Sequence, residues 1–193
     1  MSLLSALLLG FALGLALGGR PRNLNRLSLR WNWLVLASLA VQLFLFTGLS
    51  LPAGAVTVLY LLSGAMGIAW LAGNLRVPGI GCVLAGALSN FLAISLNGGR
   101  MPIDPGALAR TRGAAYVRDL AAGQLTSNSV LIDSHTRLPW LTDLILVPRP
   151  WPLPTVLSVG DVLIGLGVIW LMVAGMRGDT VGSLRGREEA TAA

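Results

Sequence analysis

The stretch VLSVGDVLIGLGVIWLMVAGM, residues 156–176, is long and apolar enough to form one membrane-spanning helix. Four similar apolar stretches precede it, at residues 2–18, 31–49, 54–71 and 77–96. Each is close to the roughly 17–25 residues that a helix needs to cross a bilayer. We therefore expect an all-α integral membrane protein, built as a bundle of about five transmembrane helices.

The composition agrees with a chain that lies mostly in lipid. Apolar residues make up 54% of the sequence and charged residues 11%, against the roughly one quarter that is typical of soluble domains. The net charge of +6 would suggest a nucleic-acid partner in a soluble protein. Here the basic residues lie at the ends of the apolar stretches, so we expect contact with membrane lipids and no nucleic-acid partner.

The arginines between the stretches alternate from crowded to sparse, which predicts the orientation. One side of the membrane would hold all of Arg20, Arg22, Arg26, Arg30, Arg76, Arg177, Arg185 and Arg187. The positive-inside rule makes that side cytoplasmic, with the amino terminus outside and the carboxyl terminus inside. The long segment 97–155 then lies outside, because long loops translocate largely regardless of charge. Residues 1–176 form a single bundle, and 177–193 are expected to be a disordered cytoplasmic tail.

The first stretch has a second interpretation, because Ala16-Leu17-Gly18 loosely resembles a signal-peptidase site. A cleaved signal peptide normally begins with a basic segment, whereas here the charges follow the apolar run. We therefore interpret residues 2–18 as an uncleaved span.

Small residues at four-residue spacing predict close helix packing in two of the spans. The two stripes contain Gly10, Gly14 and Gly18 in the first span, and Gly81, Ala85 and Ser89 in the fourth. Residues four apart share a helix face, and small side chains there let helix backbones approach in lipid. We favour packing within the chain, for example with the two stripes facing one another. The alternative is a homodimer or a partner membrane protein at these stripes.

Polar residues near the outer end of the bundle form the main candidate site. Asp161 follows Ser158 at the spacing of a capping box, which would make it structural. It also lies about one turn inside the apolar stretch, where an ionisable group is a functional candidate and needs a partner. Its possible partners are Arg100, Asn97 and Asn90. They would form either a tie between loop and bundle or a polar pocket. Gln42, in the second span, is interpreted as a structural bond between helices.

The segment 97–155 contains the remaining candidates. Asp104 before Pro105 predicts the start of a short helix near residues 106–122. The apolar run 138–148 is too short to span a membrane, so an interfacial or re-entrant piece fits it better. Asp143 lies within that run.

His135 is the single histidine of the chain, and it follows Asp133-Ser134. Neighbouring residues rarely form a catalytic triad, and one histidine does not make a typical zinc site. Cys82 is the single cysteine and is interpreted as a small buried apolar residue. We therefore expect no metal and no cofactor. Arginines near the surface, Arg100, Arg137 and Arg149, would together suit a phosphate or carboxylate group.

Several motifs resemble an uncharacterised family of small multi-span bacterial membrane proteins. They are NGGRMP at 97–102, TRLPWLTD at 136–143, SVGDVLIG at 158–165 and GGRPRNL at 18–24. The resemblance extends to about residue 176. It implies the same multi-span layout in a bacterial cytoplasmic membrane, and it supplies no activity.

Two classes of function remain open. The first is a non-catalytic accessory module, or a binder of lipid or a small anion at the outer surface. The second is a membrane-embedded enzyme or small transporter with an outward-facing polar pocket. The second requires several polar groups that are distant in the sequence to lie close together, which the sequence alone does not show.

Overall fold

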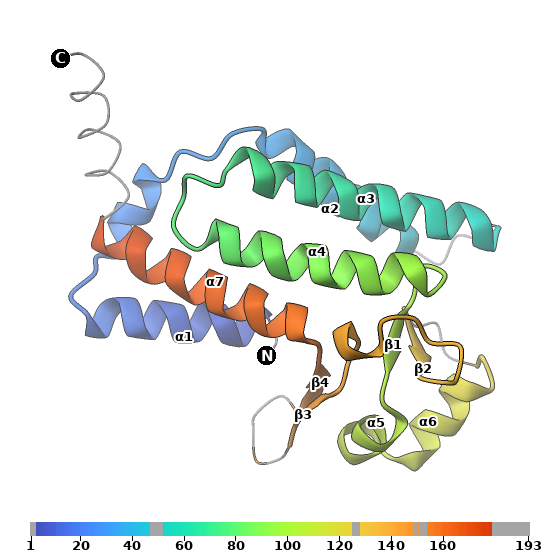
Figure 1. The fold of residues 1–193 in the computed structure, drawn as a ribbon. Helices are drawn as coiled ribbons and strands as arrows, with labels where there is room; N and C mark the ends of the chain where they lie inside the picture. The colour runs from blue at the N-terminus through green and yellow to red at the C-terminus, as the bar shows by residue number, and fades with distance from the viewer. Residues whose placement is uncertain (1–2, 47–51, 125–127, 149, 151–153, 179–193) are drawn as a thin grey trace.

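The computed structural model describes residues 3–46, 52–124, 128–148, 150 and 154–178, and the chain is mostly helical. Five apolar helices form an elongated bundle with a small module at one end (Figure 1). The bundle helices are α1 (Leu3–Ala16), α2 (Asn32–Phe46), α3 (Ala53–Gly73), α4 (Ile80–Leu96) and α7 (Val159–Arg177).

Helix α7 lies between α1 and α4 (Figure 1). Helix α4 also packs on α3, and α3 packs on α2. Gly86 of α4 contacts Gly160 of α7, and Gly79, which precedes α4, contacts Gly167, further along α7. The two helices are therefore antiparallel.

Glycines bring the backbones of α4 and α7 into direct contact. A Cβ atom at Gly160 would lie 2.6 Å from the Gly86 carbonyl oxygen, too close for any real side chain. About two turns further along α7, a Cβ at Gly167 would lie 2.7 Å from the Gly79 carbonyl oxygen. Such small-residue contacts are how helices associate in lipid, where no hydrophobic drive acts between them.

Gly10 and Gly14 of the predicted α1 stripe pack within the chain, as we favoured, whereas Gly18 follows the end of α1 and is exposed. Gly10 and Gly14 are buried against Met172 and Met176 of α7. The idea that this stripe faces the stripe of α4 is wrong, because α7 occupies that face of α1.

On α4, the buried face is the one that contains Gly86 and Ala93, whereas Gly81 and Ala85 are exposed. Because Gly81 and Ala85 are exposed, the alternative of a homodimer that packs through α4 remains an untested prediction.

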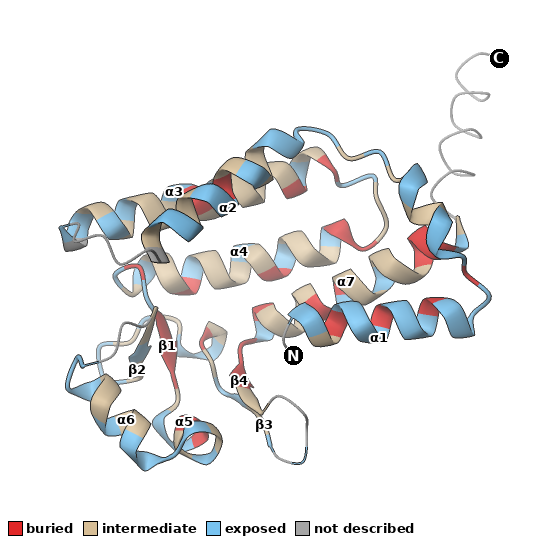
Figure 2. Cartoon of the chain, turned by 180° about the vertical axis from the view of Figure 1, so that it is seen from behind, coloured by how far each residue is buried: buried red, intermediate tan, exposed pale blue. Residues whose placement is uncertain are grey.

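The outward faces of the bundle are apolar. Leu8, Leu43, Leu62 and Trp170 are each more than half exposed, and they lie on four different helices. Figure 2 shows the exposed residues along α1, with buried residues at intervals along the same helix. Two helices, Gly54–Gly73 and Val159–Arg177, are long and apolar enough to cross a membrane, while α1, α2 and α4 are apolar but shorter.

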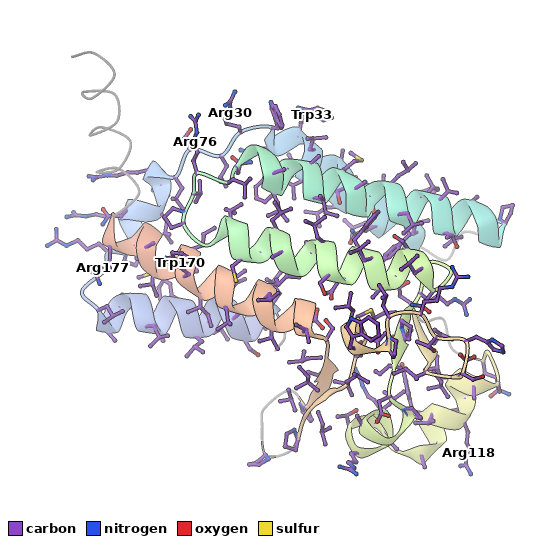
Figure 3. All side chains as sticks on the ribbon, in the orientation of Figure 1. Arg30, Trp33, Arg76, Arg118, Trp170 and Arg177 are labelled. Carbon is purple, nitrogen blue, oxygen red and sulfur yellow. The ribbon has the colours of Figure 1, made fainter. Side chains whose placement is uncertain are left out.

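Arginines gather at the end of the bundle opposite the small module. Arg30, Arg76 and Arg177 lie toward that end, whereas Arg118 belongs to the module (Figure 3). A 3₁₀ helix, η1 (Pro21–Arg26), covers the carboxyl end of α7 there. The Arg20 backbone N–H and the Asn23 side-chain amide both donate to the Met176 carbonyl at 2.8 Å. These bonds satisfy a helix-end carbonyl that has no partner within the helix.

The small module, here the cap module, comprises the described residues between 97 and 158. It contains the helices α5 (Pro105–Arg112) and α6 (Ala114–Ala121) and the 3₁₀ helix η2 (Pro139–Leu141). Strands β1 (Met101–Ile103) and β2 (Ser129–Leu131) pair in parallel, and β3 (Ile145–Val147) and β4 (Thr155–Leu157) pair antiparallel. Its core is formed by Ile103, Ala107, Leu108 and Val156.

The cap module corrects three sequence predictions. The chain is not all-α, because four short strands pair within this segment. The helix predicted at 106–122 is broken at Gly113, whose φ of +91° no ordinary side chain favours. The apolar run 138–148 forms η2 and β3, with β3 paired to β4, so that α7 begins at Val159 rather than at residue 156. Of the predicted tail, Arg177 ends α7 and Gly178 caps it, and residues 179–193 lie outside the described residues.

The glycine contact predicts the effect of one added methyl group. Gly160→Ala should force α7 away from α4 and lower stability by roughly 1–3 kcal/mol, as overpacked sites do. Thermal unfolding of the protein in detergent measures this change. The matched control is Gly81→Ala on the exposed face of α4, where the added Cβ would meet Leu75 at an ordinary 3.9 Å. Equal melting temperatures for the two variants would contradict the packing described here.

Candidate functional site

A polar cluster joins α4 to the beginning of α7, beside the cap module. Ser158 is the N-cap of α7, and its hydroxyl accepts a hydrogen bond from the Asp161 backbone N–H at 2.9 Å. The Asp161 carboxylate in turn accepts from the Ser158 backbone N–H at 3.1 Å. The capping box predicted from the spacing of these two residues is therefore present.

Asn90 connects this cap to the neighbouring helix. Its side-chain amide donates to Asp161 Oδ1 at 2.8 Å, and its carbonyl oxygen accepts from the Ser158 hydroxyl at 2.7 Å. Asn90 is thus the partner that Asp161 needs at this depth. Arg100, another of the expected partners, is exposed, and the Asp161 carboxylate is bound by Asn90 and Ser158 instead.

Asn97 bonds the loop to the end of α4, although its partner there is the Arg137 backbone and not Asp161 as the sequence suggested. It is the C-cap of α4. Its side-chain amide donates to the Arg137 carbonyl at 2.9 Å, and its carbonyl oxygen accepts from the Arg137 backbone N–H at 2.9 Å. Arg137 therefore contributes through its backbone, while its own side chain is on the exposed surface.

Backbone hydrogen bonds fix Asp143 at the centre of the cap module. Its N–H donates to the Pro102 carbonyl at 3.0 Å, and its carbonyl accepts from the Asp104 N–H at 2.9 Å. Asp104 is the N-cap of α5, as predicted, and its carboxylate accepts from the Ala107 N–H at 2.6 Å. The Leu144 N–H donates to the Leu157 carbonyl at 3.1 Å, so Asp143 is held between β1 and β4.

Asp143 is one of the residues that line a cavity of about 160 Å³ within the cap module. One guanidinium, that of Arg112, lines the same cavity, and it lies 5.8 Å from the centre of the Tyr116 ring. Hydroxyl side chains and an apolar wall complete the lining, with Thr111, Tyr116, Ser129, Thr155 and Leu120 among them. A volume this small suits one polar group rather than a drug-sized molecule, which needs roughly 300 Å³ or more.

Asp143 is the electrostatically unusual residue of this cavity, here the cap pocket. Its Oδ1 atom is buried and accepts no hydrogen bond from the described residues. Burial raises the pKa of Asp143 from 3.8 to about 7, and the negative charge of Asp161 acts in the same direction. At neutral pH the carboxyl is therefore divided between its protonated and ionised forms, and the protonated form can donate a hydrogen bond.

The structure separates His135 from this site. His135 is exposed, and its backbone N–H donates to Asp133 Oδ1 at 2.9 Å within a local turn. That bond lowers the pKa of Asp133, with smaller contributions from Thr136 and the His135 charge. Within the described ranges, no group of three or more His, Cys, Asp and Glu side chains is placed to hold a metal ion.

Two of the predicted residues, Asn90 and Asp161, are brought together, while Asn97 and Arg137 pair separately and Asp143 lines the cap pocket. The arginines predicted from the sequence to bind an anion do not include Arg112, which lines the pocket. Arg149, which was in that group, lies outside the described residues. The pocket residues come from β1, α5, α6, β2, β4 and the Asp143 segment, and no local spacing signals such a combination.

The described residues define a mostly helical protein in which two helices are apolar enough to cross a membrane and a cap module contains a polar pocket. Residues 26–173 match the family model described as Family of unknown function (DUF5317). The match covers most of the chain, and the protein belongs to this family. No curated protein and no solved structure matches it.

The pKa of Asp143 predicts how stability depends on pH. Its folded pKa of about 7 exceeds the ordinary value of 3.8, so the folded protein holds this proton more tightly than the unfolded chain. Stability should therefore fall as the pH rises from about 4 to about 7, at up to roughly 1.4 kcal/mol per pH unit. Asp143→Asn should flatten this slope and leave the variant more stable relative to wild type at pH 8. Chemical unfolding at several pH values measures the slope.

Asp133→Asn is the control for this experiment. The pKa of Asp133 is lowered, so its contribution to stability is lost below its ordinary value of 3.8, outside the window. Identical slopes for wild type and Asp143→Asn between pH 4 and 7 would contradict the assignment.

Proposed function

We propose that the protein is a multi-pass membrane protein that binds an anionic group in the cap pocket without catalysing a reaction. The observation that carries this proposal is that Arg112 and Asp143, whose Oδ1 atom is buried, both line one cavity of about 160 Å³. A permanent cation and a carboxyl that is protonated near neutral pH offer complementary donors to a phosphate or carboxylate.

Five membrane crossings and an outer position of the cap module belong to the same proposal. The apolar outward faces of the helices suit lipid, since soluble proteins rarely expose such large contiguous apolar surfaces. The arginines at the end opposite the cap module suit the cytoplasmic side under the positive-inside rule. In this orientation the cap pocket lies at the outer surface of a bacterial cytoplasmic membrane, where lipid headgroups and small anions are both within reach.

A binding role fits the pocket better than catalysis. The lining contains one carboxyl, that of Asp143, together with one guanidinium and several hydroxyls. Catalysis by an acid or base also needs a nucleophile or a second base within hydrogen-bond reach. Among the described residues, no hydrogen bond joins the Asp143 Oδ1 atom to a hydroxyl of the lining. An embedded enzyme or a transporter is the alternative, and turnover of a bound anion would favour it.

Arg112→Gln tests the proposal. The substitution removes the cation and keeps a hydrogen-bonding side chain, so binding of inorganic phosphate should weaken about 10-fold to 100-fold, in line with roughly 1.5–3 kcal/mol for a charge-assisted hydrogen bond. Calorimetric titration of the purified protein measures the affinity. The matched control is Arg118→Gln on α6, because Arg118 is exposed and outside the pocket lining.

Two further arms identify the form of the anion. Nanodiscs with and without phosphatidylglycerol distinguish a lipid headgroup from a free anion, because a headgroup should compete with phosphate. Affinity should also fall as the pH rises through about 7, since ionised Asp143 repels an anion, and Asp143→Asn should abolish that fall. Equal phosphate affinity in the Arg112 and Arg118 variants would overturn the proposal.

A further inference from the structure

A second cavity lies inside the bundle, apart from the cap pocket. It has a volume of about 220 Å³ and is lined by residues of α2, α3 and α4. Gly64 and Gly67 of α3 contribute to its lining, and a Cβ at Gly67 would meet only the Ser38 hydroxyl oxygen, at 4.0 Å. There is therefore open space beside Gly67, which a methyl group would enter without a clash.

Polar groups line this cavity, and most of them have partners. The Ser38 hydroxyl donates to the Ser63 carbonyl at 2.8 Å, and the Ser63 hydroxyl donates to the Tyr60 carbonyl at 2.7 Å. The Tyr60 hydroxyl accepts from the Asn128 side-chain amide at 2.7 Å. Asn90 is bonded to Asp161 and Ser158, as described above.

Gln42 is the exception. Within the described residues its side chain makes one hydrogen bond, from Nε2 to the Ser63 hydroxyl oxygen, at a long 3.4 Å. A glutamine amide offers two N–H donors and an oxygen with two acceptor positions. In a bilayer, an amide without partners costs several kcal/mol. The structural hydrogen bond expected for Gln42 exists, but it uses only one of the donor and acceptor positions of the amide.

The chemistry of the lining indicates which kind of group would satisfy the remaining hydrogen-bond positions of Gln42. The cavity-lining side chains include no charged residue, which disfavours ions and charged headgroups. A hydroxyl both donates to an amide oxygen and accepts from an amide N–H, so it matches both open positions of Gln42. The remaining walls are apolar and include Leu61, Ile68 and Phe91, which suit a hydrocarbon chain.

The geometry points to an intramembrane site for a neutral amphiphile, with a hydroxyl head at Gln42 and an apolar chain beside Gly67. This site is independent of anion binding at Arg112. The occupant belongs to the class of long-chain alcohols and acylglycerols, whose shared chemistry is an uncharged hydroxyl on a hydrocarbon tail.

Photolabelling with a diazirine-bearing octanol tests this inference. The full-length protein is reconstituted in nanodiscs of a single phospholipid, labelled, digested and mapped by mass spectrometry. Label is expected on cavity residues of α2, α3 and α4. An excess of octanol should reduce it several-fold, whereas octane, which lacks the hydroxyl, should not. Labelling spread evenly over lipid-facing residues and insensitive to octanol would overturn the inference.

Matched substitutions separate binding from folding. Gly67→Ala narrows the cavity at the point where the chain is proposed to lie and replaces a helical glycine, so it should raise the melting temperature and yet reduce labelling. Gly54→Ala, on the same helix with open space around its Cβ, should leave labelling unchanged.

Gln42→Leu removes the amide at similar size and should also reduce labelling, whereas Gln124→Leu in the exposed cap module should not. Full labelling in Gly67→Ala and Gln42→Leu would place the label elsewhere and refute the site. Protection of the cavity by a short-chain quinone that matches or exceeds octanol would overturn the hydroxyl assignment, because a quinone has no donor for the Gln42 oxygen.

Discussion

The backbone contact between α4 and α7 is the constraint on which the rest of the structure depends. At Gly86 and Gly160 the two helices approach so closely that neither position has room for a Cβ atom. This approach brings Asn90 within 2.8 Å of Asp161 and 2.7 Å of the Ser158 hydroxyl. In lipid, such close packing and hydrogen bonds between helices replace the hydrophobic drive that holds soluble proteins together.

The cap module is placed by the same contact. Its chain leaves the bundle at the end of α4 and re-enters it at the start of α7, so the distance between these two helix ends fixes both ends of the module (Figure 1). Asn97 bonds the Arg137 backbone at the first junction, and the Ser158 cap closes the second. Asp143 therefore lies in a position where burial and the Asp161 charge both act on its carboxyl. The polar cluster of the bundle therefore acts on the cap pocket through the charge of Asp161.

The sequence predicts the helices well and the pocket poorly, for physical reasons. Long apolar runs report burial in lipid directly, so the stretch 54–71 corresponds closely to α3 at Ala53–Gly73. The Ser158–Asp161 cap was predictable because it is local. The strands were not, since each has three residues and depends on a partner that is distant in the chain. Arg112 and Asp143 line one cavity through tertiary packing that no spacing in the sequence encodes.

In the topology proposed above, the cap module and the arginine-rich end of the bundle lie on opposite sides of a membrane. Cysteine labelling in intact cells tests this most directly. With Cys82 replaced by serine, single cysteines are introduced as Ser134→Cys in the cap module and as Arg76→Cys between α3 and α4. A membrane-impermeant maleimide should label the first in intact cells and the second only after the membrane is opened. Labelling of both positions, or of neither, in intact cells would contradict the claim.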